Sequence, residues 1–184
     1  MRIIAGAYKA RTLIAPPGAT TRPTSDRARQ ALFDMILHAP WGGSILIENA
    51  TILDAFAGTG ALGLEALSRG AGFAHFIEND PAALTALRAN IAAVKTSNAR
   101  VHASSALAPP PGPPCRLIFL DPPYGKSLIP QAAAKLAATG WIAKDTIIIA
   151  ETASAEPAPT GEPLLADRNH GAARIWVWCA STSI

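Results

Sequence analysis

Cysteine is scarce in this sequence, and its two cysteines lie far apart. Cys115 and Cys179 belong to no CxxC pair and to no cluster of cysteine and histidine. This spacing argues against a disulfide framework and against a structural zinc site, so we expect no metal. Scarce, unpaired cysteine is typical of proteins in a reducing compartment, and we therefore expect a cytoplasmic location.

Long hydrophobic runs are also absent, although apolar residues make up 49% of the chain. No run reaches the roughly 20 residues that a membrane-spanning helix needs. The N-terminus has one early arginine but no apolar signal core. The 184 residues are enough for one globular domain with a substantial core. We expect no membrane contact and, by default, a monomer.

The net charge is only +3, but basic residues are concentrated near the N-terminus. Residues 1–38 contain two acidic and six basic residues, the latter being Arg2, Lys9, Arg11, Arg22, Arg27 and Arg29. Such an arm can contact the phosphate backbone of a nucleic acid. A solvated surface explains the same charge equally well. We take Arg2, Arg22, Arg27 and Arg29 as the candidate contacts.

A helix is expected after Thr24 or Ser25, either of which can cap it. Its apolar residues form one buried face, made of Ala28, Ala31, Leu32, Met35 and Ile36. Arg29, Phe33 and Leu37 form a separate stripe with a spacing of four residues. This stripe either meets a nucleic acid or packs under a neighbouring loop.

From Thr51 onward, predicted strands and helices alternate. Strands are expected at 51–53, 73–78, 100–103, 116–121 and 146–150, with helices at 62–68, 81–94 and 128–138. Two last strands, at 164–165 and 175–178, join around Gly171 without a helix. Alternation predicts an α/β fold with a parallel sheet, helices on both faces and an antiparallel C-terminal hairpin. We divide the chain into an extension, 1–43, with short strands at 2–6 and 11–14 and a helix, and a main domain, 44–184.

A glycine turn follows the first strand of the main domain. The segment from Asp54 to Gly63 reads DAFAGTGALG, so it has neither the GxGxxG spacing nor the lysine of a P-loop. Asp54 would repel a pyrophosphate and suits a cation instead. S-adenosylmethionine carries a sulfonium and an ammonium group, which fit this charge. Glu78 follows about twenty residues later, where an acid binds ribose hydroxyls in dinucleotide folds.

The tetrapeptide from Asp121 to Tyr124 follows a buried strand and is the most specific signal in the sequence. Pro122 and Pro123 fix the backbone and remove two N–H donors, so that carbonyl oxygens and the Asp121 carboxylate remain. Such acceptors suit an exocyclic amine, with one N–H accepted by Asp121 and the other by the Pro122 carbonyl. Tyr124 can stack on the base. An amine in a paired nucleic acid must first swing out of the helix.

These motifs resemble those of a known family. DPPY at 121–124 is similar to the (D/N)PP(Y/F) motif of amino-methyltransferases. The segment 54–71 resembles motif I of the RsmD family, and 22–29 with Leu32 and Phe33 resembles its N-terminal signature. The family methylates N2 of a guanine in bacterial small-subunit ribosomal RNA.

The resemblance covers nearly the whole chain and implies a Rossmann-like class I methyltransferase with a seven-stranded sheet. S-adenosyl-L-methionine is the implied cofactor, and 16S ribosomal RNA or the 30S particle is the implied partner. The implied catalytic residues are Asp121, Pro122, Pro123 and Tyr124. The implied cofactor contacts are Asp54, Phe56, Ala57, Gly58, Gly60, Glu78, Asn79, Ser105 and Asp121.

Two features depart from the family pattern. Ser105 follows the third strand, where the adenine edge of the cofactor would lie, and it stands where many methyltransferases carry an acid or an amide. A loop serine that bonds to its own backbone explains this position nearly as well. The proline-rich segment 109–114 replaces a longer, helix-forming connection.

Three other functions are compatible with parts of the sequence. An N6-adenine methyltransferase would present its amine to the same acceptors. A non-catalytic RNA-binding assembly factor could keep the fold, although the intact acids and glycines argue against it. A nicotinamide dehydrogenase is disfavoured by the missing GxGxxG and by the Asp121 motif.

Overall fold

The computed structural model describes residues 1–16, 26–123 and 125–181. Its elements in chain order are α1 (Asp26–His38), the short 3₁₀ helix η1 (Ser44–Leu46), β1 (Thr51–Asp54), α2 (Ala61–Ser68), β2 (Phe73–Glu78), α3 (Pro81–Val94), β3 (Ala99–Ala103), β4 (Leu117–Leu120), α4 (Leu128–Ala138), β5 (Ile147–Ala153), β6 (Leu164–His170) and β7 (Ala173–Cys179).

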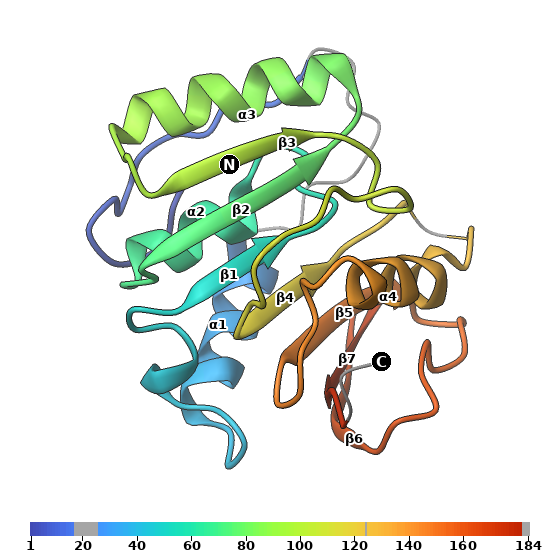
Figure 1. Ribbon diagram of the computed structural model, residues 1–184. Helices are drawn as coiled ribbons and strands as arrows, with labels where there is room; N and C mark the ends of the chain where they lie inside the picture. The colour runs from blue at the N-terminus through green and yellow to red at the C-terminus, as the bar shows by residue number, and fades with distance from the viewer. Residues whose placement is uncertain (17–25, 124, 182–184) are drawn as a thin grey trace.

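The strands form one seven-stranded sheet in the order β3-β2-β1-β4-β5-β7-β6 (Figure 1). β1 to β5 are parallel, whereas β7 runs antiparallel between β5 and β6. The chain fills the β1-to-β3 side first and then returns to add β4 and β5 on the other side of β1. The switch point therefore lies between β1 and β4. This topology confirms the predicted mixed α/β fold.

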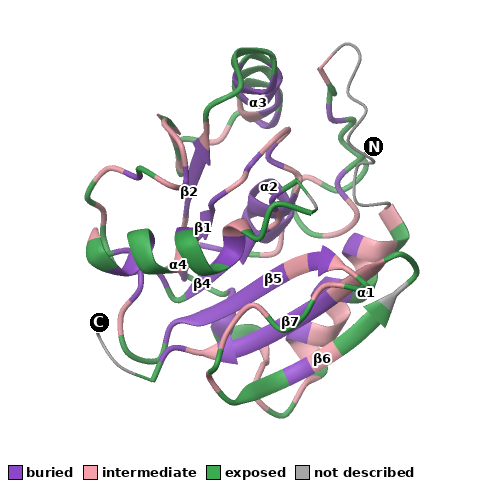
Figure 2. Cartoon of the chain, turned by 90° about the vertical axis from the view of Figure 1, so that its right-hand side faces the viewer, coloured by how far each residue is buried: buried purple, intermediate pink, exposed green. Residues whose placement is uncertain are grey.

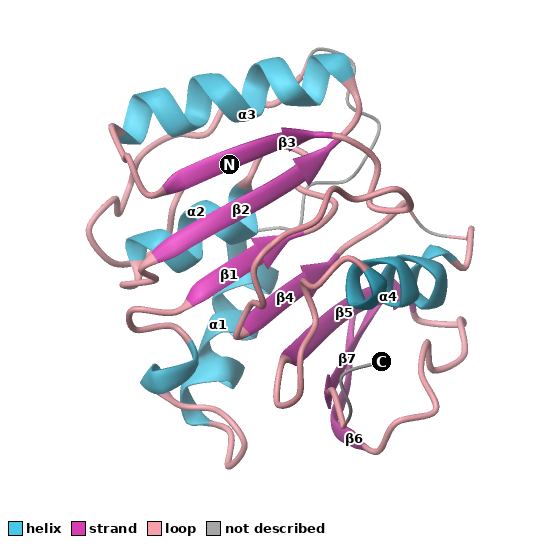
Figure 3. Cartoon of the chain, in the orientation of Figure 1, coloured by secondary structure: helices cyan, strands magenta, loops and turns pink. Residues whose placement is uncertain are grey.

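Helices cover both faces of the sheet (Figure 3). Apolar side chains of α1, α2 and α3 share one core with the sheet, including Phe33, Leu64 and Leu87. α4 and Trp141 cover the other face. The inner strands β1, β2, β4, β5 and β7 are mostly buried, whereas no residue of the edge strand β3 is buried and the other edge strand, β6, is largely exposed (Figure 2).

Several element boundaries follow from local sequence. Asp80 caps α3 as predicted, because its carboxylate accepts a hydrogen bond of 2.8 Å from the Ala83 N–H and Pro81 occupies the first turn. α4 begins and ends at the predicted residues. β6 and β7 are longer than predicted, since hairpin pairing extends through polar residues such as Asn169 opposite Arg174.

The N-terminal arm forms less sheet than expected. Its two predicted strands are reduced to one antiparallel bridge between Arg2 and Thr12. The arm instead hydrogen-bonds to α2: the Ala7 N–H donates to the Ser68 carbonyl at 2.7 Å. At Gly6, an added Cβ would lie 1.7 Å from that carbonyl oxygen, so only glycine permits the contact. Docking on α2 replaces the predicted strand pairing.

The proline-rich connector between β3 and β4 packs on the α4 side of the sheet. The Trp141 indole N–H donates to the Pro110 carbonyl at 2.7 Å, and a Cβ at Gly112 would lie 2.1 Å from the Trp141 ring. The connector thus covers part of the sheet without a helix. Among the described helices none is long and apolar enough to cross a bilayer, and no three described His, Cys, Asp or Glu residues gather as metal ligands.

Candidate active site at the carboxyl edge of the sheet

Three acidic residues meet where the parallel strands end at the switch point. Asp54, the last residue of β1, pairs with Phe76 of β2 and with Phe119 of β4. Glu78 and Asp121 each lie two residues beyond these partners. They therefore extend past the end of β1 on either side of the glycine turn. This is the crevice in which open α/β sheets bind ligands.

The glycines of the turn have different physical roles. Gly58 has a φ of +53°, and an added Cβ would meet nothing within 4 Å, so its surface is open to a ligand. At Gly60 a Cβ would lie 2.4 Å from a Leu87 methyl carbon. At Gly63 it would lie 2.2 Å from the Phe76 ring. Gly58 thus provides access, whereas Gly60 and Gly63 allow α2 to pack closely on the sheet and on α3.

The carboxylate of Glu78 is half-buried and held by backbone donors. It accepts hydrogen bonds from the N–H groups of Gly58 at 2.8 Å, Asn79 at 2.7 Å and Asp80 at 2.8 Å. An ionised carboxylate has about four acceptor sites, so one remains for a ligand hydroxyl. These bonds fix Glu78 against the glycine turn, and the exposed Asn79 follows at the rim.

Asp54 lies beneath the turn and is only 1% exposed. Its carboxylate accepts a 3.0 Å hydrogen bond from the Gly63 N–H in the first turn of α2. Burial raises the pKa of Asp54 from 3.8 to about 7, the Gly63 N–H opposes this rise, and the negative charge of Glu78 adds to it. The predicted direct contact with a cofactor does not fit this enclosure. Asp54 holds the turn through its hydrogen bond with the Gly63 N–H.

The other predicted cofactor residues lie around the same crevice. Phe56 is half-buried and packs on the α4-side core, and Ala57 is buried. Ser105 follows β3, and its hydroxyl accepts a 3.1 Å hydrogen bond from the Leu107 N–H. The Ser105 side chain therefore serves its own loop.

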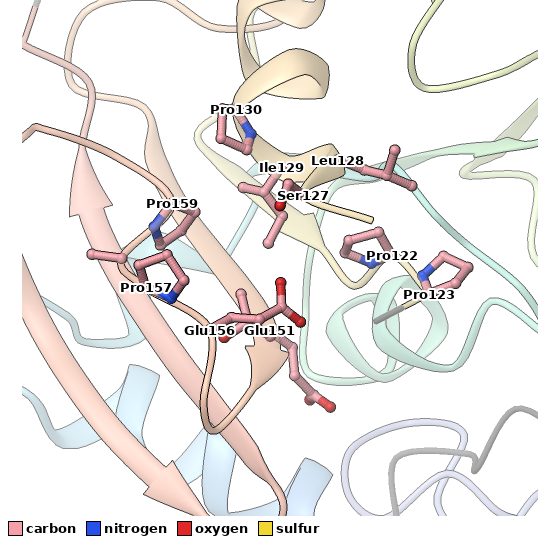
Figure 4. A pocket seen from close by; sticks show the side chains of 12 residues that line it. Pro122, Pro123, Ser127, Leu128, Ile129, Pro130, Glu151, Glu156, Pro157 and Pro159 are labelled. Carbon is pink, nitrogen blue, oxygen red and sulfur yellow. The ribbon is translucent and has the colours of Figure 1, made fainter. Parts of the chain in front are cut away.

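The predicted catalytic segment follows β4 directly. Asp121 is half-buried, Pro122 is buried and Pro123 is exposed. Tyr124 lies outside the described residues. Pro122 and Pro123 line a pocket together with the first residues of α4, the end of β5 and the loop that follows it (Figure 4). A substrate group that enters this pocket lies beside the Asp121 motif.

The four arginines predicted to contact RNA differ in exposure. The Arg2 side chain is 68% exposed, with Nε 3.6 Å from Asp26 Oδ2. Arg27 is exposed on α1. Arg22 lies outside the described residues. Arg29 is fully buried.

Burial of Arg29 contradicts its predicted role at an RNA-facing surface. Its Nε lies 3.6 Å from Glu65 Oε2 and its Nη2 lies 3.0 Å from Asp26 Oδ1, and Nη2 also donates to the Arg2 carbonyl. Phe33, from the same predicted stripe, is buried as well. The stripe packs under the N-terminal arm and α2 because Glu65 supplies a buried counter-charge for the guanidinium.

Glu65 is the main residue that the sequence analysis missed. It is fully buried on α2, and it accepts hydrogen bonds from the N–H groups of Ile4 at 2.8 Å and Ala5 at 3.1 Å. Its Oε1 also lies 2.8 Å from Arg69 Nε. A lone acid in an apolar helix, four residues before an arginine, was the available signal. Glu65 joins the N-terminal arm to α1 and α2.

Asn90 on α3 was also missed, and it makes a second such connection. Its Oδ1 accepts from the Ile14 N–H at 2.7 Å, while its Nδ2 donates to the carbonyls of Ile14 at 3.0 Å and Thr59 at 2.9 Å. Nothing in the helix sequence distinguishes it. Because Thr59 belongs to the glycine turn, Asn90 ties the N-terminal arm to the cofactor-side loop.

Comparison with known proteins shows the family of this chain. The family model described as Conserved hypothetical protein 95 matches residues 1–178. Ribosomal RNA small subunit methyltransferase D of Escherichia coli is 39% identical over 162 residues, which are 87% of this chain and 78% of that protein. The protein of the same name in Haemophilus influenzae is 35% identical, over 88% of this chain and 83% of that protein.

The structural comparison gives the same result. A solved structure of a putative methyltransferase, yhhF from Escherichia coli, superposes with a TM-score of 0.82 and 35% identity, over 99% of this chain and 98% of that one. The chain therefore belongs to the Conserved hypothetical protein 95 family, the family of ribosomal RNA small subunit methyltransferase D that its motifs predict.

Proposed function

We propose that this protein transfers a methyl group from S-adenosylmethionine to the exocyclic N2 of a guanine in small-subunit ribosomal RNA. The observation that carries the proposal is the position of Glu78 and Asp121 on either side of the glycine turn. A cofactor site and an amine-accepting site then share one crevice. The names of the relatives supply the class of RNA.

The residues around the turn fit S-adenosylmethionine. Gly58 leaves open space for the ligand, and Glu78 retains acceptor capacity for one ribose hydroxyl. Asp54 places a carboxylate beneath the turn, where a cation favours its ionised form. The bound cofactor would supply an electrophilic methyl group.

Asp121 and the Pro122 carbonyl act on the target amine. Each accepts one N–H of the amine, which turns the nitrogen lone pair away from them. As the new N–C bond forms, the methyl–sulfur bond of the cofactor would break and leave a neutral thioether. Positive charge grows on the nitrogen, and the Asp121 carboxylate stabilises it until the methylated amine releases a proton. Neither proline offers an N–H that would compete for the lone pair. The chemistry depends on orientation and charge, without a covalent enzyme intermediate.

RNA binding is assigned to the exposed basic residues of the N-terminal part. Arg2 and Arg27 are exposed in the described structure. Arg22 remains a candidate by sequence alone. Arg29 now supports the fold instead, since its charge faces Glu65.

The test compares cofactor binding with methyl transfer in Asp121→Ala. We expect methyl transfer to fall by at least about 100-fold, because an oriented charge is lost from the transition state. Calorimetry should show nearly unchanged affinity for S-adenosylmethionine. Mapping of N2-methylguanine in small-subunit RNA, with and without the gene, identifies the nucleotide.

Two results would contradict the proposal. An equal loss of cofactor affinity and transfer in Asp121→Ala would remove the assigned role of that residue. Loss of N6-methyladenine, with every N2-methylguanine intact, in RNA from the deletion strain would replace guanine by adenine as the substrate.

A further inference from the structure

Two carboxylates that the proposed mechanism does not use, Glu151 and Glu156, line the pocket beside Pro122. Glu156 lies in the loop after β5, and it lines this pocket together with Pro122 and Pro123. Figure 4 shows its side chain between the segment Pro157–Pro159 and Pro122. An acidic group therefore stands next to the place assigned to the target amine.

The Glu156 carboxylate is held in a fixed orientation by two backbone groups. Its Oε1 accepts hydrogen bonds from the Gly125 N–H at 3.1 Å and the Ala153 N–H at 3.2 Å. Gly125 directly follows the DPPY motif, and Ala153 ends β5. One oxygen of Glu156 thus connects the catalytic loop to the sheet. Within the described part of the chain, Oε2 accepts no hydrogen bond.

Guanine and adenine differ at the atom next to the exocyclic amine. In guanine, N1 beside the N2 amine carries a hydrogen and donates. In adenine, N1 beside the N6 amine has a lone pair and accepts. An ionised carboxylate is an acceptor only. A carboxylate at this position therefore binds the guanine edge and repels the adenine edge, and flipped bases are read at this Watson–Crick edge.

We propose that Glu156 selects guanine by accepting the N1–H of the target base with Oε2, while Oε1 holds the catalytic loop. The inference rests on the proposed function, since it assumes that an exocyclic amine is held at Asp121 and Pro122. Asp121 and Glu156 then read neighbouring donors of one base edge. Glu156 determines specificity, and the reaction itself occurs at Asp121.

The variant Glu156→Gln converts this acceptor into a donor. Its amide oxygen can keep both backbone hydrogen bonds, which leaves the NH₂ group in the place of Oε2. The test uses RNA that carries the mapped target nucleotide as guanine or as 2-aminopurine. Both bases have the same 2-amino group, but N1 of 2-aminopurine has no hydrogen.

Wild-type protein should methylate guanine about 10- to 100-fold better than 2-aminopurine, the range of a charge-assisted hydrogen bond. Glu156→Gln should lose guanine activity by a similar factor and should prefer 2-aminopurine. Affinity for S-adenosylmethionine and thermal stability should change little. The matched control is Glu162→Gln in the same loop, because Glu162 lies outside the pocket and accepts from the Ser181 hydroxyl at 2.8 Å. Glu162→Gln should keep the wild-type preference for guanine over 2-aminopurine.

Two outcomes would overturn the inference. If Glu156→Gln keeps the wild-type preference for guanine, Glu156 does not read N1. If Glu156→Ala slows methylation of the two bases equally while Glu156→Gln behaves like wild type, Glu156 only holds the loop. If the protein does not methylate guanine N2 at all, the wild type will methylate neither RNA. That result differs from both outcomes above.

Discussion

The raised pKa of Asp54 predicts that the stability of the folded protein falls as pH rises. The variant Asp54→Asn should lack this pH dependence. Asp54 is enclosed beneath the glycine turn, where burial raises its pKa from 3.8 to about 7. One pKa unit corresponds to about 1.4 kcal/mol. Ionising Asp54 in the folded protein therefore costs about 4 kcal/mol relative to the unfolded chain.

The sign of the effect follows from proton binding. Between pH 3.8 and about 7, the folded state keeps a proton on Asp54 that the unfolded state has released. The contribution of Asp54 to stability is thus fully present below pH 3.8, and it is lost as pH rises through about 7. An asparagine stays neutral throughout, and its amide oxygen can still accept from the Gly63 N–H.

Urea unfolding of both proteins, without ligand, at pH 4.5, 6 and 8 measures this effect. We expect the free energy of unfolding of wild type to fall relative to Asp54→Asn by about 3 kcal/mol over this range. Subtracting the free energy of unfolding of one protein from that of the other cancels the contributions of the other titrating groups. A difference that stays constant from pH 4.5 to 8 would refute the argument.

The same ionisation should couple to cofactor binding. A cation in the crevice lowers the pKa of Asp54, so binding of S-adenosylmethionine near pH 6 should release a proton. Calorimetry in two buffers with different ionisation enthalpies measures the release. We expect about one proton at most for wild type and a clearly smaller value for Asp54→Asn. Equal release by the two proteins would assign the proton to another group.

Three further predictions concern the fold, the turn and the RNA-facing surface. Glu65→Gln should lower the free energy of unfolding by about 3 kcal/mol in urea titrations, because Arg69 loses its counter-charge and the buried Arg29 keeps only Asp26. A change below about 1 kcal/mol would contradict the ion-pair assignment. Gly63→Ala should lower stability by about 1–3 kcal/mol through its clash with Phe76. Gly58→Ala should weaken S-adenosylmethionine binding and, because its φ is +53°, should also cost about 1 kcal/mol of backbone strain. Unchanged cofactor affinity in Gly58→Ala, or an unchanged melting temperature in Gly63→Ala, would contradict these roles. Arg27→Glu should weaken RNA binding and reduce its salt slope by about one, and an unchanged slope would exclude Arg27 as a phosphate contact.

Much of the fold could be predicted because its signals are local. Alternating strands and helices give the mixed sheet, and the Asp80 cap and Pro81 place the start of α3. The N-terminal arm could not be predicted in the same way. Its strand-like residues lack a strand partner beyond one bridge, and its N–H groups donate instead to the Ser68 carbonyl and the Glu65 carboxylate. These partners lie about sixty residues away, at a distance that local patterns do not encode.

The candidate site was predictable to a similar extent. The glycine turn, Glu78 and the Asp121 motif were found from residue type and spacing, and the family they predict is confirmed. Their individual roles stay predictions. Arg29 was wrongly placed at the surface, since helical periodicity gives the direction of a side chain but not the element that covers it. Glu156 gave no signal in its proline-rich loop.

By itself, the sequence determined which segments become strands and helices, and which acids stand at the ends of strands. Hydrophobic periodicity, capping residues and the backbone limits of glycine and proline act over a few residues, so they can be read directly. Only the tertiary structure decided that Arg29 turns inward to Glu65, that Asp54 is enclosed, and that Glu156 reaches Gly125. Those outcomes depend on burial and on contacts between distant segments, which arise only when the sheet and its helices assemble.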